Sequence, residues 1–271
     1  MKTRGYRGRL APSPTGFLHL GHAQTFWIAA ERARQARGDL VLRIENIDRA
    51  RSRREFVDAI IEDLRWLGIA WNEGPVLQSE RMELYRAAFE KLRSEGRLYQ
   101  CSCSRKEILL AAPHAEDDEA VYPGLCRSKK LSGAHNWRFR VSDGEEISFV
   151  DGAFGEQRFV AGRDIGDFVV WTREGMPSYQ LAAVVDDAEM GITEVVRGAD
   201  LLMSTGRQLL LYRALGWAAP AFYHCHLVKN SEGARLAKRA DALSLRALRQ
   251  QGLTPEDVRG RFTPPPGPGS A

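Results

Sequence analysis

The segment 9–22, with the sequence RLAPSPTGFLHLGH, constrains the fold more than any other part of the chain. Its short apolar start predicts a strand, two prolines and a glycine predict a sharp turn, and apolar residues at helical spacing then predict a helix. His19 and His22 stand at the start of that helix, where unpaired backbone N–H groups and the helix dipole favour anions. Gly21 lies between them and leaves room for a flat ligand against the backbone. The segment therefore predicts either a polyphosphate-binding turn or an ordinary strand–turn–helix with two surface histidines.

Residues 40–45 place this turn in a parallel α/β sheet. They form a short, β-rich apolar run directly after the first helix, so strand, helix and strand follow one another. Similar runs at 168–171 and 192–196 predict further buried strands. Because ligands of open α/β sheets bind at the carboxyl ends of strands, Glu45 is a candidate binding residue. A solvated turn at that position is the alternative.

The sequence predicts five further helices, and alternating residues predict two more strands. The predicted helices cover about residues 52–67, 80–96, 179–185, 204–215 and 243–251. The pattern Ser-x-x-Glu at 52–55 predicts a capping box for the first of them, and two aspartates at 186–187 predict an acidic turn after the third. We expect the two strands, at 137–141 and 147–150, to pair with each other.

Composition excludes a membrane-spanning chain and permits a nucleic-acid partner. No segment approaches the roughly 18 consecutive apolar residues of a membrane span, and no apolar stretch follows the basic N-terminus. We therefore expect a cytoplasmic protein with no membrane partner. The formal net charge is +4, and 32 of the 39 basic residues are arginine. Arginine suits phosphate and carboxylate recognition, although genome composition explains the same bias.

Three of the four cysteines, Cys101, Cys103 and Cys126, are close in sequence. In a reducing compartment, clustered thiols indicate a metal site more than a disulfide. Three thiolates suit zinc, but tetrahedral structural sites usually have a fourth ligand. No histidine stands at a fitting spacing, although His114 lies in the intervening segment. The remaining thiol, Cys225, is predicted to be a core residue.

The whole segment 9–22 resembles the first signature of class I aminoacyl-tRNA synthetases, and APSPTG at 11–16 resembles their glutamyl branch. RLAKR at 235–239 resembles the second signature, the Lys-Met-Ser-Lys-Ser loop, in weakened form; taken alone it is a solvated basic turn. The resemblance covers about residues 7–250. It implies that a carboxylate attacks the α-phosphate of ATP and that magnesium pyrophosphate leaves. The residues implied in ATP binding are His19, Gly21, His22 and Lys238, of which the two histidines and the lysine are catalytic.

The same resemblance implies a glutamate pocket that supplies arginines and a carboxylate. The positions that match the glutamyl pattern are Arg9, Ala11, Ser13, Glu45, Tyr179 and Arg197. Arg9 and Arg197 would bind carboxylates through paired hydrogen bonds, and Glu45 would receive the ammonium group. A surface ion pair is the alternative for Arg197.

The cysteine pattern, Cys-x-Cys followed by Tyr-x-x-x-Cys, resembles that of one glutamyl offshoot, the glutamyl-queuosine tRNA(Asp) synthetases. It implies one structural zinc per chain, held by Cys101, Cys103, Tyr122 and Cys126. About 33 residues follow the second signature, so we expect no anticodon-binding domain. That family activates L-glutamate with ATP and Mg²⁺ in the absence of tRNA and places it on the queuosine base of tRNA(Asp). We expect a monomer.

Two alternatives stay open at this point. One is a minimal glutamyl-tRNA synthetase that charges the 3′ end of tRNA. The other is a non-catalytic protein that binds tRNA or nucleotides on the same fold, for which the weakened second signature is the only support.

The predicted fold is α/β, a Rossmann-like parallel sheet of the class I synthetase type with a small zinc-bearing insertion. The predicted parts are the first half of the catalytic domain at 1–98, the insertion at 99–165, the second half of the catalytic domain at 166–230, the second signature with a C-terminal helix at 231–262, and a disordered tail at 263–271.

Overall fold

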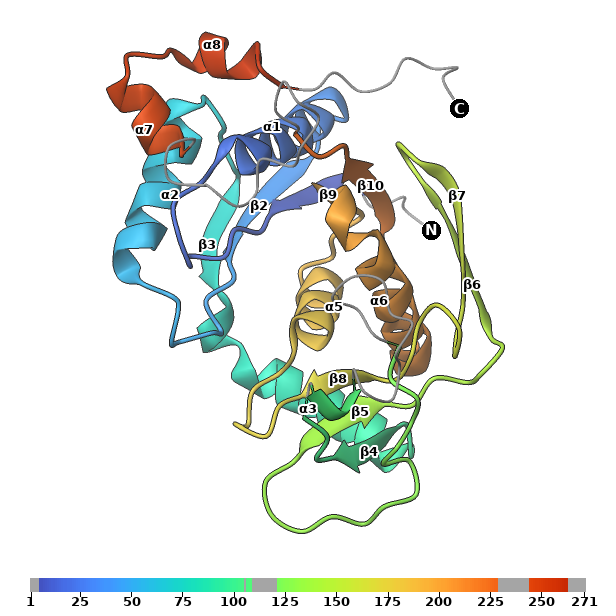
Figure 1. The fold of residues 1–271 in the computed structure, drawn as a ribbon. Coiled ribbons are helices and arrows are strands. Elements are labelled where there is room, and N and C mark those ends of the chain that lie inside the picture. The colour runs from blue at the N-terminus through green and yellow to red at the C-terminus, as the bar shows by residue number, and fades with distance from the viewer. Residues whose placement is uncertain (1–4, 105, 109–120, 229–243, 263–271) are drawn as a thin grey trace.

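Five parallel strands form the centre of the fold in the computed structural model, which describes residues 5–104, 106–108, 121–228 and 244–262 (Figure 1). Strands β1 (Arg7–Leu10), β2 (Asp39–Ile44) and β3 (Glu73–Leu77) pair in the order β1-β2-β3. Strands β9 (Glu194–Gly198) and β10 (Ala221–Cys225) pair in parallel in a second sheet. The backbone N–H of Thr193 donates to the carbonyl of Arg7 at 2.8 Å, so β9 lies beside β1.

The strand order reverses between β1 and β9, which is where open α/β sheets bind ligands. From this point β2 and β3 extend to one side and β10 to the other. The carboxyl ends of β1, β2 and β9 deliver Leu10, Ile44 and Gly198 to one edge, beside the residues named as candidates from the sequence. The predicted parallel sheet is confirmed.

Helices cover both faces of these strands. One face carries α1 (Leu20–Gln35), α2 (Arg54–Trp66), α7 (Leu245–Gln250) and α8 (Pro255–Arg259), which share a core with β1 and β2. The other carries α5 (Tyr179–Glu189) and α6 (Leu202–Leu215), which lie between the parallel strands and a small antiparallel sheet in Figure 1. That sheet has the order β4 (Leu98–Cys101), β5 (Asn136–Phe139) and β8 (Phe168–Trp171), and α3 (Met82–Ser94) packs in the same core. Two single-turn helices, η1 (Gln78–Glu80) and η2 (Ala199–Leu201), precede α3 and α6.

The segment predicted as an insertion contributes to two different sheets. Strand β5 pairs with β4 and β8, whereas β6 (Glu146–Asp151) pairs with β7 (Gly155–Val160) and, through Asp151 and Phe222, with β10. The prediction that 137–141 and 147–150 pair with each other was therefore wrong. The side chain of Asp151 explains the arrangement, because it accepts hydrogen bonds from the backbone and ring of His224 on β10.

Two predicted local features were also wrong. The helix α2 starts at Arg54 with Arg53 as its N-cap and no side-chain cap, and the hydroxyl of Ser52 is buried without a partner. Asp186 and Asp187 lie inside α5, not in a turn after it, and both are buried. The helix α6 ends as predicted at Gly216, whose φ of 72° suits glycine.

The described part of the chain contains no helix that is long and apolar enough to cross a lipid bilayer. The second signature at 235–239 and the tail at 263–271 lie outside the described residues.

Asp63 on α2 generates a prediction about stability. The side chain is buried, its Oδ2 has no hydrogen-bond partner, and burial raises its pKa from 3.8 to about 6. The folded state therefore binds more protons than the unfolded chain between these values, so this group lowers stability as the pH rises through that window. We expect Asp63→Asn to increase the free energy of unfolding by about 1–2 kcal/mol above pH 7, and hardly at all near pH 3.5.

Urea denaturation at both pH values measures this effect. Asp58→Asn, on the exposed side of the same helix, is the matched control and should change stability by less than about 0.5 kcal/mol. A gain at position 63 that is equal at both pH values would contradict the prediction.

Candidate active site

The turn between β1 and α1 is built around the two predicted histidines. His19 is the N-cap of α1, and its Nδ1 accepts the backbone N–H of Gly21 at 3.1 Å. The Nδ1 of His22 accepts the backbone N–H of His19 at 3.3 Å, so each imidazole satisfies a donor at the start of the helix. The rings stack with their centroids 3.8 Å apart. A Cβ on Gly21 would stand 3.1 Å from the His19 ring, which explains why a glycine fits between them.

These contacts determine where the ring protons lie. Because Nδ1 accepts in both rings, the proton of each neutral imidazole is on Nε2, which is left as a donor. Burial lowers the pKa of His19, against an opposing effect of Asp200. Desolvation by the surrounding protein is the larger cause that lowers the pKa of His22, and the neighbouring ring of His19 lowers it further. Part of the His22 side chain is still exposed to solvent. Both rings are therefore neutral near pH 7 and offer N–H groups to an anion at the helix N-terminus.

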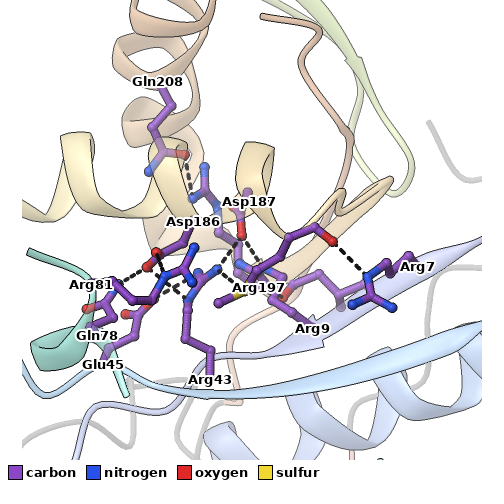
Figure 2. A network of polar contacts seen from close by, with 12 residues as sticks. Arg7, Arg9, Arg43, Glu45, Gln78, Arg81, Asp186, Asp187, Arg197 and Gln208 are labelled. Atoms are coloured by element: carbon purple, nitrogen blue, oxygen red, sulfur yellow. Dashed lines mark hydrogen bonds and ion pairs between the residues drawn. The ribbon is translucent and has the colours of Figure 1, made fainter. Parts of the chain in front are cut away.

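Next to this turn, a fully buried arginine organises a network of ion pairs (Figure 2). Arg43 on β2 pairs with Glu45 at 3.0 Å, with Asp187 at 2.7 Å and with Asp186 at 3.6 Å. Burial opposes its charge, but the three carboxylates outweigh this and raise its pKa well above the ordinary value. Arg43 is therefore permanently charged and joins β2 to α5.

Asp186 is saturated by structural partners. Its carboxylate accepts hydrogen bonds from Gln78 and Arg81 at 2.7 Å and from the hydroxyl of Tyr85 at 2.9 Å. Asp187 also lies 3.5 Å from Nε of Arg9, a distance that makes an ion pair but no hydrogen bond. Sequence reasoning missed both aspartates as site residues. Their only signal was a pair of adjacent acids on an otherwise apolar helix.

Arg9 and Arg197, the two predicted carboxylate-binding residues, are both buried. Arg9 donates to the carbonyl of Val196 at 2.7 Å, and burial lowers its pKa. Arg197 donates to Gln208 at 2.8 Å and to Thr205 at 2.7 Å, which are neutral acceptors. Within the described residues Arg197 pairs with no carboxylate, which excludes the surface ion pair considered from the sequence.

Buried polar atoms without partners mark the same region. Nε of Arg9, Nε2 of Gln208 and the hydroxyl of Tyr212 have no hydrogen-bond partner. A buried polar group without a partner costs free energy, so these atoms indicate a place for a polar ligand. The excess of arginine over available carboxylate indicates that the ligand is an anion.

The other predicted residues lie around these arginines. Tyr179, at the start of α5, is 40% exposed, and its hydroxyl is 3.4 Å from Nη1 of Arg197. Ala11 and Ser13 lie in the turn after β1, and the backbone N–H of Glu45 donates to the carbonyl of Pro12 in that turn at 2.9 Å. Burial raises the pKa of Glu45 although Arg43 opposes this. Lys238 lies outside the described residues.

The predicted thiol cluster forms a second site. The sulfur atoms of Cys101, Cys103 and Cys126 lie within 4.8 Å of one another, and the hydroxyl of Tyr122 is 3.4 Å from the first two. A tetrahedral zinc with sulfur ligands at about 2.3 Å separates them by about 3.8 Å, so the group can hold a metal ion with little rearrangement. His114 lies outside the described residues, and Cys225 is buried in the core as predicted.

The chain is similar to known proteins in sequence and in fold. A model of the family described as tRNA synthetases class I (E and Q), catalytic domain, matches residues 6–262. Glutamyl-Q tRNA(Asp) synthetases of Symbiobacterium thermophilum and Nitratidesulfovibrio vulgaris are 50% and 45% identical to the chain. Each alignment covers 94% of this chain and 84% of the relative. The chain belongs to the glutamyl-Q tRNA(Asp) synthetase family.

Membership of this family confirms the predicted resemblance and makes the chain a ligase of the class I synthetase type. A glutamate tRNA ligase from Elizabethkingia meningosepticum, solved in complex with its amino acid, has a TM-score of 0.76 and 28% identity. The similarity covers 92% of this chain and 54% of that one, so the chain spans about half the length of that ligase.

The burial of Arg43 generates a prediction about stability. Arg43→Met removes the cation that compensates three carboxylates, and we expect it to lower the free energy of unfolding by about 3–5 kcal/mol. The loss should be smaller at acid pH, because unpaired buried carboxylates take up protons. Urea denaturation measures both effects.

Arg51→Met is the matched control, since Arg51 pairs with Asp48 on the surface. It should cost less than about 1 kcal/mol. If the two variants were equally stable, the network around Arg43 would not hold β2 and α5 together.

Proposed function

We propose that the protein activates L-glutamate with ATP, without the help of tRNA, and transfers it to the queuosine base of tRNA(Asp). The observation that supports this most is the pair of buried arginines, Arg9 and Arg197, which lie at the reversal of strand order and donate no hydrogen bond to a carboxylate of the described residues. Glutamate carries two carboxylates and one ammonium group. We take glutamate and tRNA(Asp) as the substrates from the names of the chain's relatives, the glutamyl-Q tRNA(Asp) synthetases.

The roles follow from charge. We assign the substrate carboxylates to Arg9 and Arg197, with Ala11, Ser13 and Tyr179 lining the same pocket. We assign the ammonium group to Glu45, whose buried carboxylate gains a second cation in addition to Arg43. Aspartate is one methylene shorter and cannot reach both arginines, and glutamine leaves one of them without an anionic partner.

The ATP phosphates would lie at the N-terminus of α1, on the Nε2 donors of His19 and His22, with the adenine against Gly21. A glutamate carboxylate oxygen attacks the α-phosphorus, and the bond to the oxygen that bridges to the β-phosphate breaks. Pyrophosphate leaves with the electron pair. Such a step needs positioning and charge stabilisation more than a protein nucleophile. Lys238 would stabilise the leaving pyrophosphate, and Mg²⁺ bound with ATP would neutralise its charge.

In the second step a hydroxyl of the queuosine cyclopentenediol attacks the acyl carbon of the adenylate. The ester bond forms, the hydroxyl loses its proton, and AMP leaves with the electron pair. This diol is chemically similar to the ribose diol that synthetases normally esterify, so the same adenylate serves a different nucleophile.

A row of arginine and aromatic side chains beside the first signature supports an RNA partner. Arg246 lies 5.3 Å from the ring of Phe17, this ring packs edge to face on Phe56 at 5.1 Å, and Arg53 lies 6.0 Å from Phe56. Both rings are partly exposed. Such surfaces stack unpaired bases and contact phosphates.

The test of the function uses labelled glutamate. We expect glutamate-dependent exchange of pyrophosphate into ATP without tRNA, and transfer of glutamate to tRNA(Asp) that contains queuosine. The same tRNA with unmodified guanine should not accept glutamate. Acceptance should persist after the 3′-terminal adenosine is removed, because the base and not the 3′ end is the target.

The outcomes separate the alternatives. A minimal charging enzyme is favoured by relatives such as glutamate–tRNA ligase 2 of Nitrosococcus oceani, which is 40% identical. It would lose acceptance on trimming and would charge unmodified tRNA(Glu). A non-catalytic binding protein would show no exchange at all.

We also propose one structural zinc per chain, bound by Cys101, Cys103, Tyr122 and Cys126. The grouping of the three thiols supports it, as does Arg138, which donates to the sulfur of Cys101 at 3.2 Å and balances thiolate charge. We expect one zinc per chain by metal analysis. Cys101→Ser should lower both the zinc content and the melting temperature, whereas Cys225→Ser should leave the zinc content unchanged. Purified, active protein without zinc would contradict the proposal.

A further inference from the structure

Behind Arg197 lies a chain of buried side chains to which the mechanism assigns no role. The ring of His224 on β10 stands between Arg197 on β9 and Asp151 on β6. Its Nε2 is 3.1 Å from Nε of Arg197, and its Nδ1 is 2.6 Å from Oδ2 of Asp151. The side chains of His224 and Asp151 are 0% exposed.

The direction of each hydrogen bond is determined by Arg197. An arginine Nε–H can only donate, so Nε2 of His224 accepts and the ring proton lies on Nδ1, which donates to Asp151. Burial lowers the pKa of His224, so the ring is neutral. Burial opposes the charge of Asp151, but hydrogen bonds from His224, Ala153 and Phe154 outweigh this and lower its pKa.

These contacts fix the orientation of Arg197 without forming an ion pair that would compensate its charge. Its Nε donates to a neutral ring, and its Nη1 and Nη2 donate to the neutral oxygens of Gln208 and Thr205. A carboxylate in place of His224 would orient the guanidinium equally well. It would also form an ion pair that competes with a substrate carboxylate.

We propose that His224, held in one tautomer by Asp151, is a positioning residue. It orients Arg197 toward the substrate carboxylate and, being neutral, leaves the charge of Arg197 available to that carboxylate. The inference rests on the proposed function only in the assignment of Arg197 to glutamate. It also explains why β6 pairs with β10, since that pairing brings Asp151 to His224.

Asp151→Asn is the sharpest test, because the other oxygen of Asp151 is already committed. Oδ1 accepts the backbone N–H groups of Ala153 at 2.9 Å and Phe154 at 3.0 Å. An asparagine would keep its oxygen there and turn its NH₂ group toward Nδ1 of His224. The backbone N–H of His224 would lose its contact with Oδ2 at 3.2 Å and keep the one with Oδ1 at 3.3 Å. The ring proton would then move to Nε2, where it would face the N–H of Arg197 or bond to Oγ1 of Thr205, which is 3.1 Å away. In either case Nε2 would no longer accept the hydrogen bond from Arg197.

We expect Asp151→Asn to raise the KM for glutamate in pyrophosphate exchange by about tenfold or more, with the KM for ATP changed less than about threefold. Nitrogen-15 NMR of the histidine rings should show protonation of Nδ1 in the wild type and of Nε2 in the variant. Asp164→Asn is the matched control, since Asp164 lies just after the same hairpin, accepts hydrogen bonds from Val160 and Arg163, and should change neither measurement.

A second pair of variants decides the case if Asp151→Asn does not fold. His224→Gln keeps an acceptor for Arg197, whereas His224→Leu does not, so the KM for glutamate should rise less in the first. An unchanged KM with the exchanged tautomer, or equal effects of Gln and Leu, would overturn the inference. Wild-type protein that shows no glutamate-dependent exchange would instead overturn the proposed function, while the NMR measurement still tests the tautomer.

Discussion

The ion pairs of Arg43 are the interaction on which the rest of the site depends. An arginine with no exposed surface loses several kcal/mol of hydration, so it stays in place only if carboxylates surround it. Asp186 and Asp187 on α5 supply two of these carboxylates, and Glu45, which directly follows β2, supplies the third. The contact fixes α5 against β2. Because Asp187 accepts its hydrogen bond from Arg43, it forms only a longer ion pair with Arg9, at 3.5 Å and without a hydrogen bond.

Two kinds of buried arginine can be distinguished by what they donate to. Arg43 donates to carboxylates, and such an arginine is neutralised and structural. Arg197 donates to an imidazole, an amide and a hydroxyl, so its orientation is fixed while its charge remains uncompensated. A protein has little reason to bury an uncompensated charge for stability. The second kind therefore indicates an anionic ligand, and this criterion needs no sequence comparison.

The sequence predicts what short-range interactions determine. The strand, turn and capping histidines of segment 9–22 depend on neighbours a few residues apart, and the parallel sheet follows from the order of its elements. Asp187 and Arg43 are 144 residues apart, and no local pattern connects them. Acids at the end of a helical pattern are normally exposed, so an acidic turn was the natural prediction. The pairing of β6 with β10 was missed for the same reason, since the contact of Asp151 with His224 spans 73 residues.

Two of the contacts that connect segment 99–165 to the rest of the chain differ in their chemistry. At one end the thiol cluster rests on Arg138, which stacks 3.9 Å above the ring of Tyr122 and donates to the carbonyl of Asp167 just before β8. At the other end Asp151 reaches His224 directly. We therefore expect a change in the thiol cluster to act first on the sheet β4-β5-β8, and a change at Asp151 to act on Arg197. We also expect substrate binding to depend on those residues of segment 99–165 that lie close to the pocket in space. Membership of the segment alone does not decide this.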